Sequence, residues 1–149
     1  MMDASIGRKR LPHEIPLTTL AGPEDEVFFV TICCLPRGIN QLAMPDVWQM
    51  MDETLSLREA MGDLHVRLVL AMPDHLHGLF SFQGTHPMTK VMTDFKSWMA
   101  KSSGVRWQRD FFDHRLRGFE SAAEKANYIR NNPVRAGFVS QSADWPYQR

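Results

Sequence analysis

The sequence has little cysteine and no long hydrophobic run, and each lack excludes a class of protein. Its two cysteines, Cys33 and Cys34, are adjacent. In a strand they would point to opposite faces, so neither a disulfide framework nor a shared metal site fits them. No apolar run approaches the roughly 18 residues that a membrane span requires. Pro12 and Pro16 fall where a signal peptide would be apolar. We therefore expect a cytoplasmic protein without a membrane partner.

An excess of charge of one sign is also lacking. Seventeen basic residues balance seventeen acidic ones, which argues against a crude polyelectrolyte binder. The distribution is uneven, because residues 1–64 hold five basic and ten acidic side chains, whereas residues 101–149 hold nine and five (9 − 5 = +4). A basic C-terminal third is typical of a localised anion site, although a solvated face has the same composition.

Length and composition predict one globular domain over residues 1–149. The chain is 44% hydrophobic and 23% charged, which excludes wholesale disorder. Residues 1–26 hold three prolines and an acidic run, so we expect an irregular N-terminal arm there. Residues 140–149 are expected to form a short tail.

Hydrophobic periodicity predicts an α+β fold. Residues 64–72 and 75–82 alternate as strands do, and 88–99 carry a helical stripe of methionines and aromatics that we interpret as core. The order strand, helix, strand, strand, helix, strand predicts a ferredoxin-like split βαβ arrangement. Its four-stranded antiparallel sheet would carry two helices on one face, leave the other open for a ligand, and be followed by a C-terminal helix. Strands are expected at 27–34, 64–72, 75–82 and within 105–116. Helices are expected at 44–61, over 88–99 with an end at residues 102–104, and from Ser121 until Pro133 ends the last one.

Two histidines in the second strand of the 64–82 region form the sharpest local motif. His75 and His77 flank Leu76, so both imidazoles project from one strand face. Together they make a partial site for a divalent cation, and Gly78 would leave room beside them for a bulky ligand. Two histidines on a solvated face are the alternative.

One of only two tyrosines lies in the helix that Ser121 begins. Tyr128 and Asn132 are four residues apart, so they share a helix face. We expect this face to be polar and to include Lys125. A structural tyrosine is the alternative to a nucleophile. Tyr147 is a poorer candidate, because we do not expect rigid positioning two residues from residue 149 and directly after Trp145 and Pro146.

Basic and aromatic residues interleave over 107–117. Such a surface could contact phosphates and stack on unpaired bases, and part of it must be core. His114 could contact DNA, assist catalysis or be packed.

In combination, these motifs resemble a known family. The segment 72–77 (MPDHLH) is similar to the His-hydrophobe-His motif of single-tyrosine transposases. The segment 128–139 (YIRNNPVRAGFV) resembles the tyrosine-helix signature of REP-associated tyrosine transposases, and the segments 8–13, 107–117 and 144–146 are similar in order and spacing. Two departures are Asp74, where the family often has Asn, and a first strand without the histidine that many relatives carry there.

This resemblance implies a bacterial, nucleoid-associated transposase-like nuclease acting on single-stranded or hairpin DNA, as a monomer or homodimer. Mg²⁺ or Mn²⁺ would sit on His75, His77 and Asn132, and Tyr128 would attack a phosphate to form a 5′-phosphotyrosine link that a 3′-hydroxyl can reverse. Together with the clusters of basic residues, the resemblance implies that the following side chains contact DNA: Arg8, Lys9, Arg10, Arg109, His114, Arg115, Arg117, Lys125, Arg130 and Arg135.

Two other functions suit the same residues. A protein with this fold could bind DNA or RNA hairpins without cleaving them. Alternatively, a metal-dependent phosphodiesterase could use water, with Tyr128 only positioning the substrate. Only a transposase would form a covalent protein–DNA adduct through Tyr128, so detection of such an adduct would exclude both alternatives.

Overall fold

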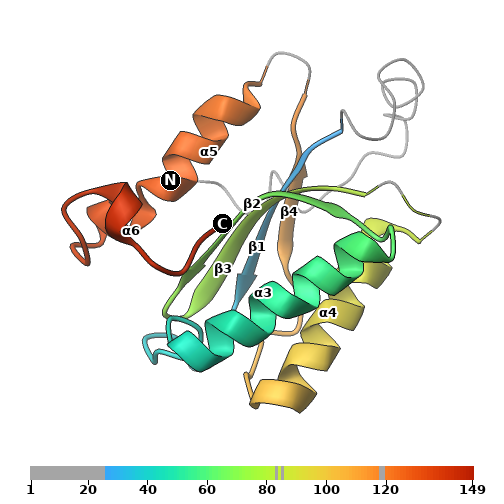
Figure 1. Cartoon of the computed structure of the whole chain (residues 1–149), viewed down its shortest axis with the longest axis horizontal. Coiled ribbons are helices and arrows are strands. Elements are labelled where there is room, and N and C mark those ends of the chain that lie inside the picture. Colours follow the sequence, from blue (N-terminus) through green and yellow to red (C-terminus); the bar gives the residue numbers. More distant parts are fainter. Residues whose placement is uncertain (1–25, 83, 85, 118–119) are drawn as a thin grey trace.

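Strands and helices alternate in the order β-α-β-β-α-β, followed by a helical C-terminal segment (Figure 1). The computed structural model describes residues 26–82, 84, 86–117 and 120–149. The elements are β1 (Phe28–Cys33), α3 (Pro45–Ala60), β2 (His65–Met72), β3 (His75–Ser81), α4 (Met88–Ser103), β4 (Phe112–Arg115), α5 (Ala122–Arg130), α6 (Asn132–Arg135) and a 3₁₀ turn (Ser142–Asp144). All of the elements expected beyond residue 26 are present, with one correction: the helix expected from Ser121 to Pro133 already ends at Arg130, and Pro133 lies in the first turn of α6.

The sheet has the strand order β2-β3-β1-β4, and every neighbouring pair is antiparallel. Helices α3 and α4 lie together on one side of it, whereas α5 and α6 lie on the other (Figure 1). The predicted split βαβ fold with an added C-terminal helix is therefore confirmed. The register sets Thr31 opposite His77 and Cys33 opposite His75, which brings the centre of β1 beside the histidine pair.

The face under α3 and α4 is a hydrophobic core. Alternate residues of β1, from Phe28 to Ile32, point into it and meet buried residues of both helices. The stripe of α4 is core as expected, with one exception: Trp98 is 53% exposed. The helix residues that line this core are Met51, Leu55, Met88, Val91, Met92, Phe95 and Met99.

The opposite face is not open, which corrects the sequence-based expectation. Ile129 of α5 and Trp145 are buried against Phe29 and Leu79 of the sheet, and Ala122 and Ala126 complete the apolar side of α5 as expected. Burying these groups offsets the cost of ordering the C-terminal segment. A second, smaller core therefore covers part of the face that carries the histidines.

Strand β2 serves both cores because its alternation is interrupted. A bulge between Val66 and Leu68 shifts the register, so Val66 packs toward α3 and α4 whereas Leu68 and Leu70 pack toward α5. A bulge inserts one extra residue and reverses the faces beyond it. The prediction of a strand with a single apolar face was wrong for this reason.

Residues 145–149 are docked, which corrects the argument against Tyr147. The amides of Val69 and Ala71 donate to the carbonyls of Arg149 and Tyr147, at 2.8 and 2.9 Å. The indole nitrogen of Trp145 donates to the carbonyl of Ala71 (2.9 Å), and its ring packs edge-on against Tyr147. The end of the chain therefore adds to the β2 edge of the sheet.

Gly78 makes room for a core side chain, not for a ligand beside the histidines. A Cβ atom at this position would lie 2.2 Å from the Phe80 ring, on the face of α3 and α4. The expectation that it leaves space beside His77 was therefore wrong.

Within the described residues, none of the helices combines the length and apolar character needed to cross a bilayer.

Candidate active site

The predicted histidine pair lies side by side under α5 and α6. His75 and His77 are both half-buried, and their rings meet edge to face with centroids 4.8 Å apart. Strand alternation explains the arrangement, because residues i and i+2 share a face. The prediction that both imidazoles project in one direction is confirmed.

Each imidazole is held through its Nδ1 atom. Nδ1 of His75 lies 2.9 Å from a carboxylate oxygen of Asp74, and Nδ1 of His77 lies 2.9 Å from the hydroxyl of Thr31. Thr31 reaches His77 because the two residues are register partners in β1 and β3. Both Nε2 atoms are therefore the ring nitrogens left for a further ligand.

Burial keeps both rings neutral near pH 7. It lowers the pKa of His77 to about 3, with the charges of His75 and Arg135 acting in the same direction. Burial also lowers the pKa of His75, against the opposing effect of the Asp74 carboxylate. Neutral imidazole is the form that binds a metal ion, so the pair needs no deprotonation to do so.

Asn132 reaches the pair from the C-terminal segment. Its amide nitrogen lies 3.5 Å from Nε2 of His75, and a half-turn of the amide would present its oxygen instead. Ser121 caps α5 by accepting from the amide of Glu124 (3.1 Å), as expected. Asn131 ends α5, and Pro133 then occupies the first turn of α6, where a missing N–H costs nothing.

Tyr128 lies between two cations on the polar side of α5. It is 39% exposed, and the Arg135 guanidinium stacks 4.2 Å from the centroid of its ring. Arg135 also donates to the backbone carbonyl of Tyr128 (2.9 Å). Lys125 lies 5.9 Å from the ring on its own helix. Because Arg135 also influences the pKa of His77, it links the tyrosine to the histidine pair.

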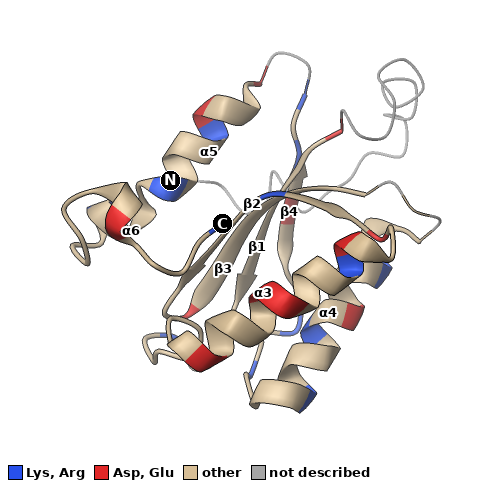
Figure 2. Cartoon of the chain, viewed as in Figure 1, with Lys and Arg blue, Asp and Glu red and all other residues tan. Residues whose placement is uncertain are grey.

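Helix α3 and the segment formed by α5 and α6 carry net charges of opposite sign (Figure 2). Helix α3 holds four acidic residues and one basic residue (1 − 4 = −3), whereas α5 and α6 together hold three basic residues and one acidic residue (3 − 1 = +2). Arg130 and Arg135 are exposed on this positive segment. An anionic ligand is therefore favoured on the side of α5 and repelled by α3.

The structure changes the status of several expected DNA contacts. Arg115 is only 9% exposed and its guanidinium is paired with Glu26, so we no longer expect it to contact DNA. Its register partner is Phe28, so its side chain lies on the face of the sheet that α3 and α4 cover. His114 is bonded to the Glu120 carboxylate (3.1 Å), and Arg117 donates to the same carboxylate through its backbone amide (2.6 Å). Arg8, Lys9 and Arg10 lie outside the described residues.

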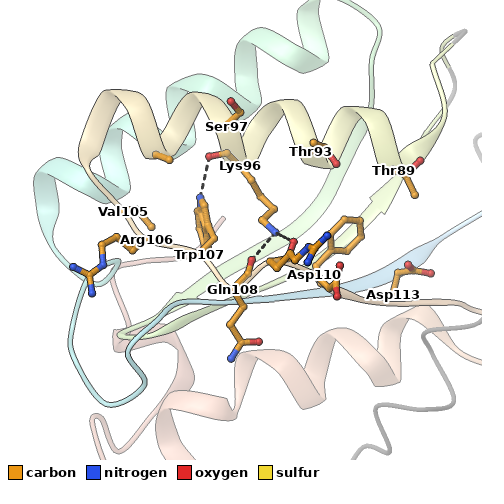
Figure 3. Close-up of a pocket in the computed structure, with 13 residues that line it drawn as sticks. Thr89, Thr93, Lys96, Ser97, Val105, Arg106, Trp107, Gln108, Asp110 and Asp113 are labelled. Atoms are coloured by element: carbon orange, nitrogen blue, oxygen red, sulfur yellow. Dashed lines mark hydrogen bonds between the residues drawn. The ribbon is translucent and has the colours of Figure 1, made fainter.

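Arg109 is exposed and lines a groove on the side of the sheet that carries α4. Figure 3 shows this groove. The groove, of about 790 Å³, lies between α4 and residues 105–113. Its wall is braced by Lys96, whose ammonium donates to the carbonyls of Gln108 (2.8 Å) and Arg109 (3.0 Å). The indole nitrogen of Trp107 donates in turn to the carbonyl of Lys96 (3.0 Å). Trp107 and Phe111 therefore serve as scaffold, and Arg106 and Arg109 face solvent.

Asp74, Thr31 and Arg37 are site residues that sequence reasoning did not assign. Asp74 directly precedes the first histidine, so its position in the chain was an available signal. Thr31 and Arg37 gave none, because they lie 46 and 37 residues from their partners. Among the described residues, no three His, Cys, Asp or Glu side chains gather closely enough to hold a metal ion.

Comparison with known proteins places these features in a family context. No protein-family model matches the chain. It is 27% identical over 81 residues to an Escherichia coli protein named REP-associated tyrosine transposase, an alignment that covers 52% of this chain and 49% of the relative. It is 31% identical over 97 residues to a Haemophilus influenzae protein named as a candidate of the same kind, covering 53% and 54%. The chain thus spans about half the length of the curated relatives it matches.

Two solved structures share the fold. One is a REP-associated tyrosine transposase bound to a REP hairpin, with a TM-score of 0.73 and 22% identity over 84% of this chain and 76% of the other. The other is a candidate transposase of Deinococcus radiodurans, with a TM-score of 0.50 and 16% identity over 71% and 88%. In both sequence and fold, the chain is similar to REP-associated tyrosine transposases.

Proposed function

We propose that the protein is a metal-assisted endonuclease and strand transferase that acts on single-stranded DNA at repeat hairpins. One observation carries this proposal: Asn132 lies against His75, and Tyr128 precedes Asn132 by four residues on the same helical segment. A nucleophile and a metal-ligand candidate are thereby held on two consecutive helices that are joined at Asn131. Such linkage is what a covalent transfer needs to bring an attacking oxygen to an activated phosphate.

Hairpin DNA is the substrate that the surroundings favour. The hairpin-bound relative has the same fold, and the positive segment formed by α5 and α6 borders the site. Lys125, Arg130 and Arg135 would neutralise phosphates near Tyr128, whereas Arg109 would contact DNA away from the scissile phosphate. This arrangement suits a folded or looped nucleic acid that reaches more than one side of the domain.

His75, His77 and Asn132 would hold a divalent metal ion such as Mg²⁺ or Mn²⁺. The donor set fits, because both imidazoles are neutral and both Nε2 atoms are left for coordination. Two nitrogen ligands and an amide oxygen also accept softer metals, which should bind more tightly than Mg²⁺. When bound, the metal would polarise the scissile phosphate and offset its developing charge.

The proposed chemical step conserves the energy of the bond that it breaks. The phenol oxygen of Tyr128 forms a bond to phosphorus and gives its proton to solvent, while the bond from phosphorus to the 3′-oxygen breaks. That oxygen takes a proton and leaves as a free 3′-hydroxyl, and the DNA 5′-phosphate remains on Tyr128. The 3′-hydroxyl of a second strand can reverse the step, so joining needs no ATP. The cations of Lys125 and Arg135 would stabilise the negative charge at the phenol oxygen.

The test is a denaturing gel of the protein with a labelled single-stranded hairpin and Mn²⁺. Wild-type protein should give a covalent band, and Tyr128→Phe should abolish it while hairpin affinity and thermal stability persist. Tyr147→Phe is the matched control, because Tyr147 is the second tyrosine and lies in a docked segment. A covalent band that survives in Tyr128→Phe would refute the assignment of the nucleophile.

The products also separate the two alternative functions. Cleavage that leaves a free 5′-phosphate and no adduct would indicate a phosphodiesterase that uses water. Tight hairpin binding without cleavage by the wild-type protein, across Mg²⁺ and Mn²⁺, would indicate a binding protein.

A further inference from the structure

Asp74 lies at the centre of a small hydrogen-bonded cluster in the turn between β2 and β3. One carboxylate oxygen meets Nδ1 of His75 at 2.9 Å. The other accepts from Nε of Arg37 (2.9 Å) and from the backbone amide of Gly38 (2.8 Å). Both oxygens of the side chain are therefore used, and the side chain is only 16% exposed.

An ionised carboxylate can only accept hydrogen bonds. Its pairing with the Arg37 guanidinium keeps Asp74 in that form. The proton shared with His75 must then reside on Nδ1 of the ring, and Nε2 carries the lone pair. This Nε2 is the atom that lies 3.5 Å from the amide of Asn132. Thr31 cannot dictate the tautomer of His77 in the same way, because a hydroxyl both donates and accepts.

We propose that Asp74 is a positioning residue that sets the tautomer and orientation of His75 for metal binding, and that Arg37 and Gly38 hold its carboxylate in place. The inference rests on the proposed function, since it requires that His75 binds the metal. It also assigns a role to the loop after β1, which is linked to the turn of residues 73 and 74 through Cys34, Gln41 and Leu42.

An ordinary structural ion pair would behave differently from a positioning group. If Asp74 only anchored the loop, removing either partner of the Arg37–Asp74 pair would destabilise the fold and leave metal affinity unchanged. If Asp74 positions His75, its loss should matter more than the loss of Arg37, because without Arg37 the Gly38 amide still holds the carboxylate on His75.

The experiment titrates Mn²⁺ alone into the full chain by calorimetry and measures thermal unfolding of each variant without metal. Asp74→Ala should weaken Mn²⁺ binding by about 10- to 100-fold, the usual cost of losing such a partner. Asp74→Asn keeps one acceptor oxygen for His75 and should recover part of the affinity, and Arg37→Ala should cost less than Asp74→Ala. Equal affinities for wild type, Asp74→Ala and Arg37→Ala would overturn the proposal.

Asp63→Ala is the matched control. Asp63 has a similar exposure (12%) and pairs with Arg58 at 3.0 Å. It precedes β2, at the opposite end of that strand from His75 and His77, so its loss should lower stability without changing Mn²⁺ affinity at the pair. Should Asp74→Ala fail to fold, ¹⁵N NMR of metal-free wild type decides the question: a proton on Nδ1 of His75 supports the proposal and a proton on Nε2 overturns it. Wild type that binds no Mn²⁺ would instead refute the metal site of the proposed function.

Discussion

The two faces of the sheet differ in what the same strands present to them. Toward α3 and α4, β1 contributes Val30 and Ile32, which are buried among methionines and phenylalanines. Toward α5, the same strand contributes Thr31, which holds His77. Because side chains alternate along a strand, one segment of six residues supplies both a hydrophobic core and part of a polar site.

This difference separates stability from chemistry. The face of α3 and α4 offers large apolar burial and borders an acidic helix. The face of α5 offers neutral imidazoles, a tyrosine between cations and a smaller core. Substitutions on the first face should therefore change the free energy of unfolding, and substitutions on the second should change binding and catalysis.

The largest effect on stability is expected at Phe95. Phe95→Ala removes a fully buried ring from the centre of α4 and should lower the free energy of unfolding by about 3–5 kcal/mol, measured by urea denaturation. Trp98→Ala, on the same helix, should cost less than about 1 kcal/mol because Trp98 is exposed. A cost for Trp98→Ala as large as that for Phe95→Ala would show that the outer face of α4 is also buried.

Substitution of His77 should reduce metal affinity rather than stability. His77→Ala removes one candidate ligand and should weaken Mn²⁺ binding by more than about 100-fold, since the loss of a mere partner of a ligand costs up to that factor. Unfolding should remain cooperative. Phe95→Ala, measured at a temperature where it is folded, should keep wild-type Mn²⁺ affinity. Weakened binding in Phe95→Ala alone would contradict the separation of the two faces.

Two arginines of one segment should behave in opposite ways. Arg115→Gln breaks the largely buried ion pair with Glu26 and should cost about 3 kcal/mol of stability. Arg109→Gln should leave stability unchanged, but it should weaken hairpin binding and reduce the salt dependence of affinity by about one counterion. Binding isotherms at several salt concentrations test this. If Arg109→Gln binds with the wild-type slope, the exposed arginine is only a solvated charge.

The smallest effect is a pH dependence at Glu59, which joins α3 to the end of the chain. Burial opposes its ionisation, but hydrogen bonds from the Val66 amide and from Arg149 lower its pKa below the ordinary value. A carboxylate with a lowered pKa stabilises the fold above its unfolded pKa, and this stabilisation is lost as pH falls through the folded pKa. Glu59→Gln should therefore be less stable than wild type at pH 7 and lose less stability on acidification below about pH 4. Urea midpoints at pH 7 and pH 3 measure this, and parallel losses would contradict it.

Local patterns were sufficient to predict the elements and the order of the fold. The alternation over 75–81, the stripe of α4 and the cap at Ser121 are all short-range signals. They also placed His75 and His77 on one face, and Tyr128 with Asn132 on one helical segment. These residues lie within one element or in consecutive elements, so their spacing alone constrains them.

Features that depend on distant partners could not be predicted in this way. Apolar residues occupy every second position from Leu64 to Met72, on both sides of Arg67. This regular alternation gives no local sign of the bulge in β2. Arg37 meets Asp74 only after the sheet has formed, and the docking of residues 145–149 depends on the free edge of β2. Pairing between remote segments determines all three, and a single sequence gives no direct measure of it.

The docked end of the chain also has a consequence for self-association. A bare sheet edge offers unpaired amides and carbonyls that recruit strands from other molecules. Here the amides of Val69 and Ala71 are already bonded to residues 149 and 147, while at the opposite margin β4 is only four residues long. Neither margin is a long template for intermolecular pairing. Deleting residues 146–149 would uncover one of them, and the shortened protein should aggregate more readily at high concentration even where its active-site residues are intact.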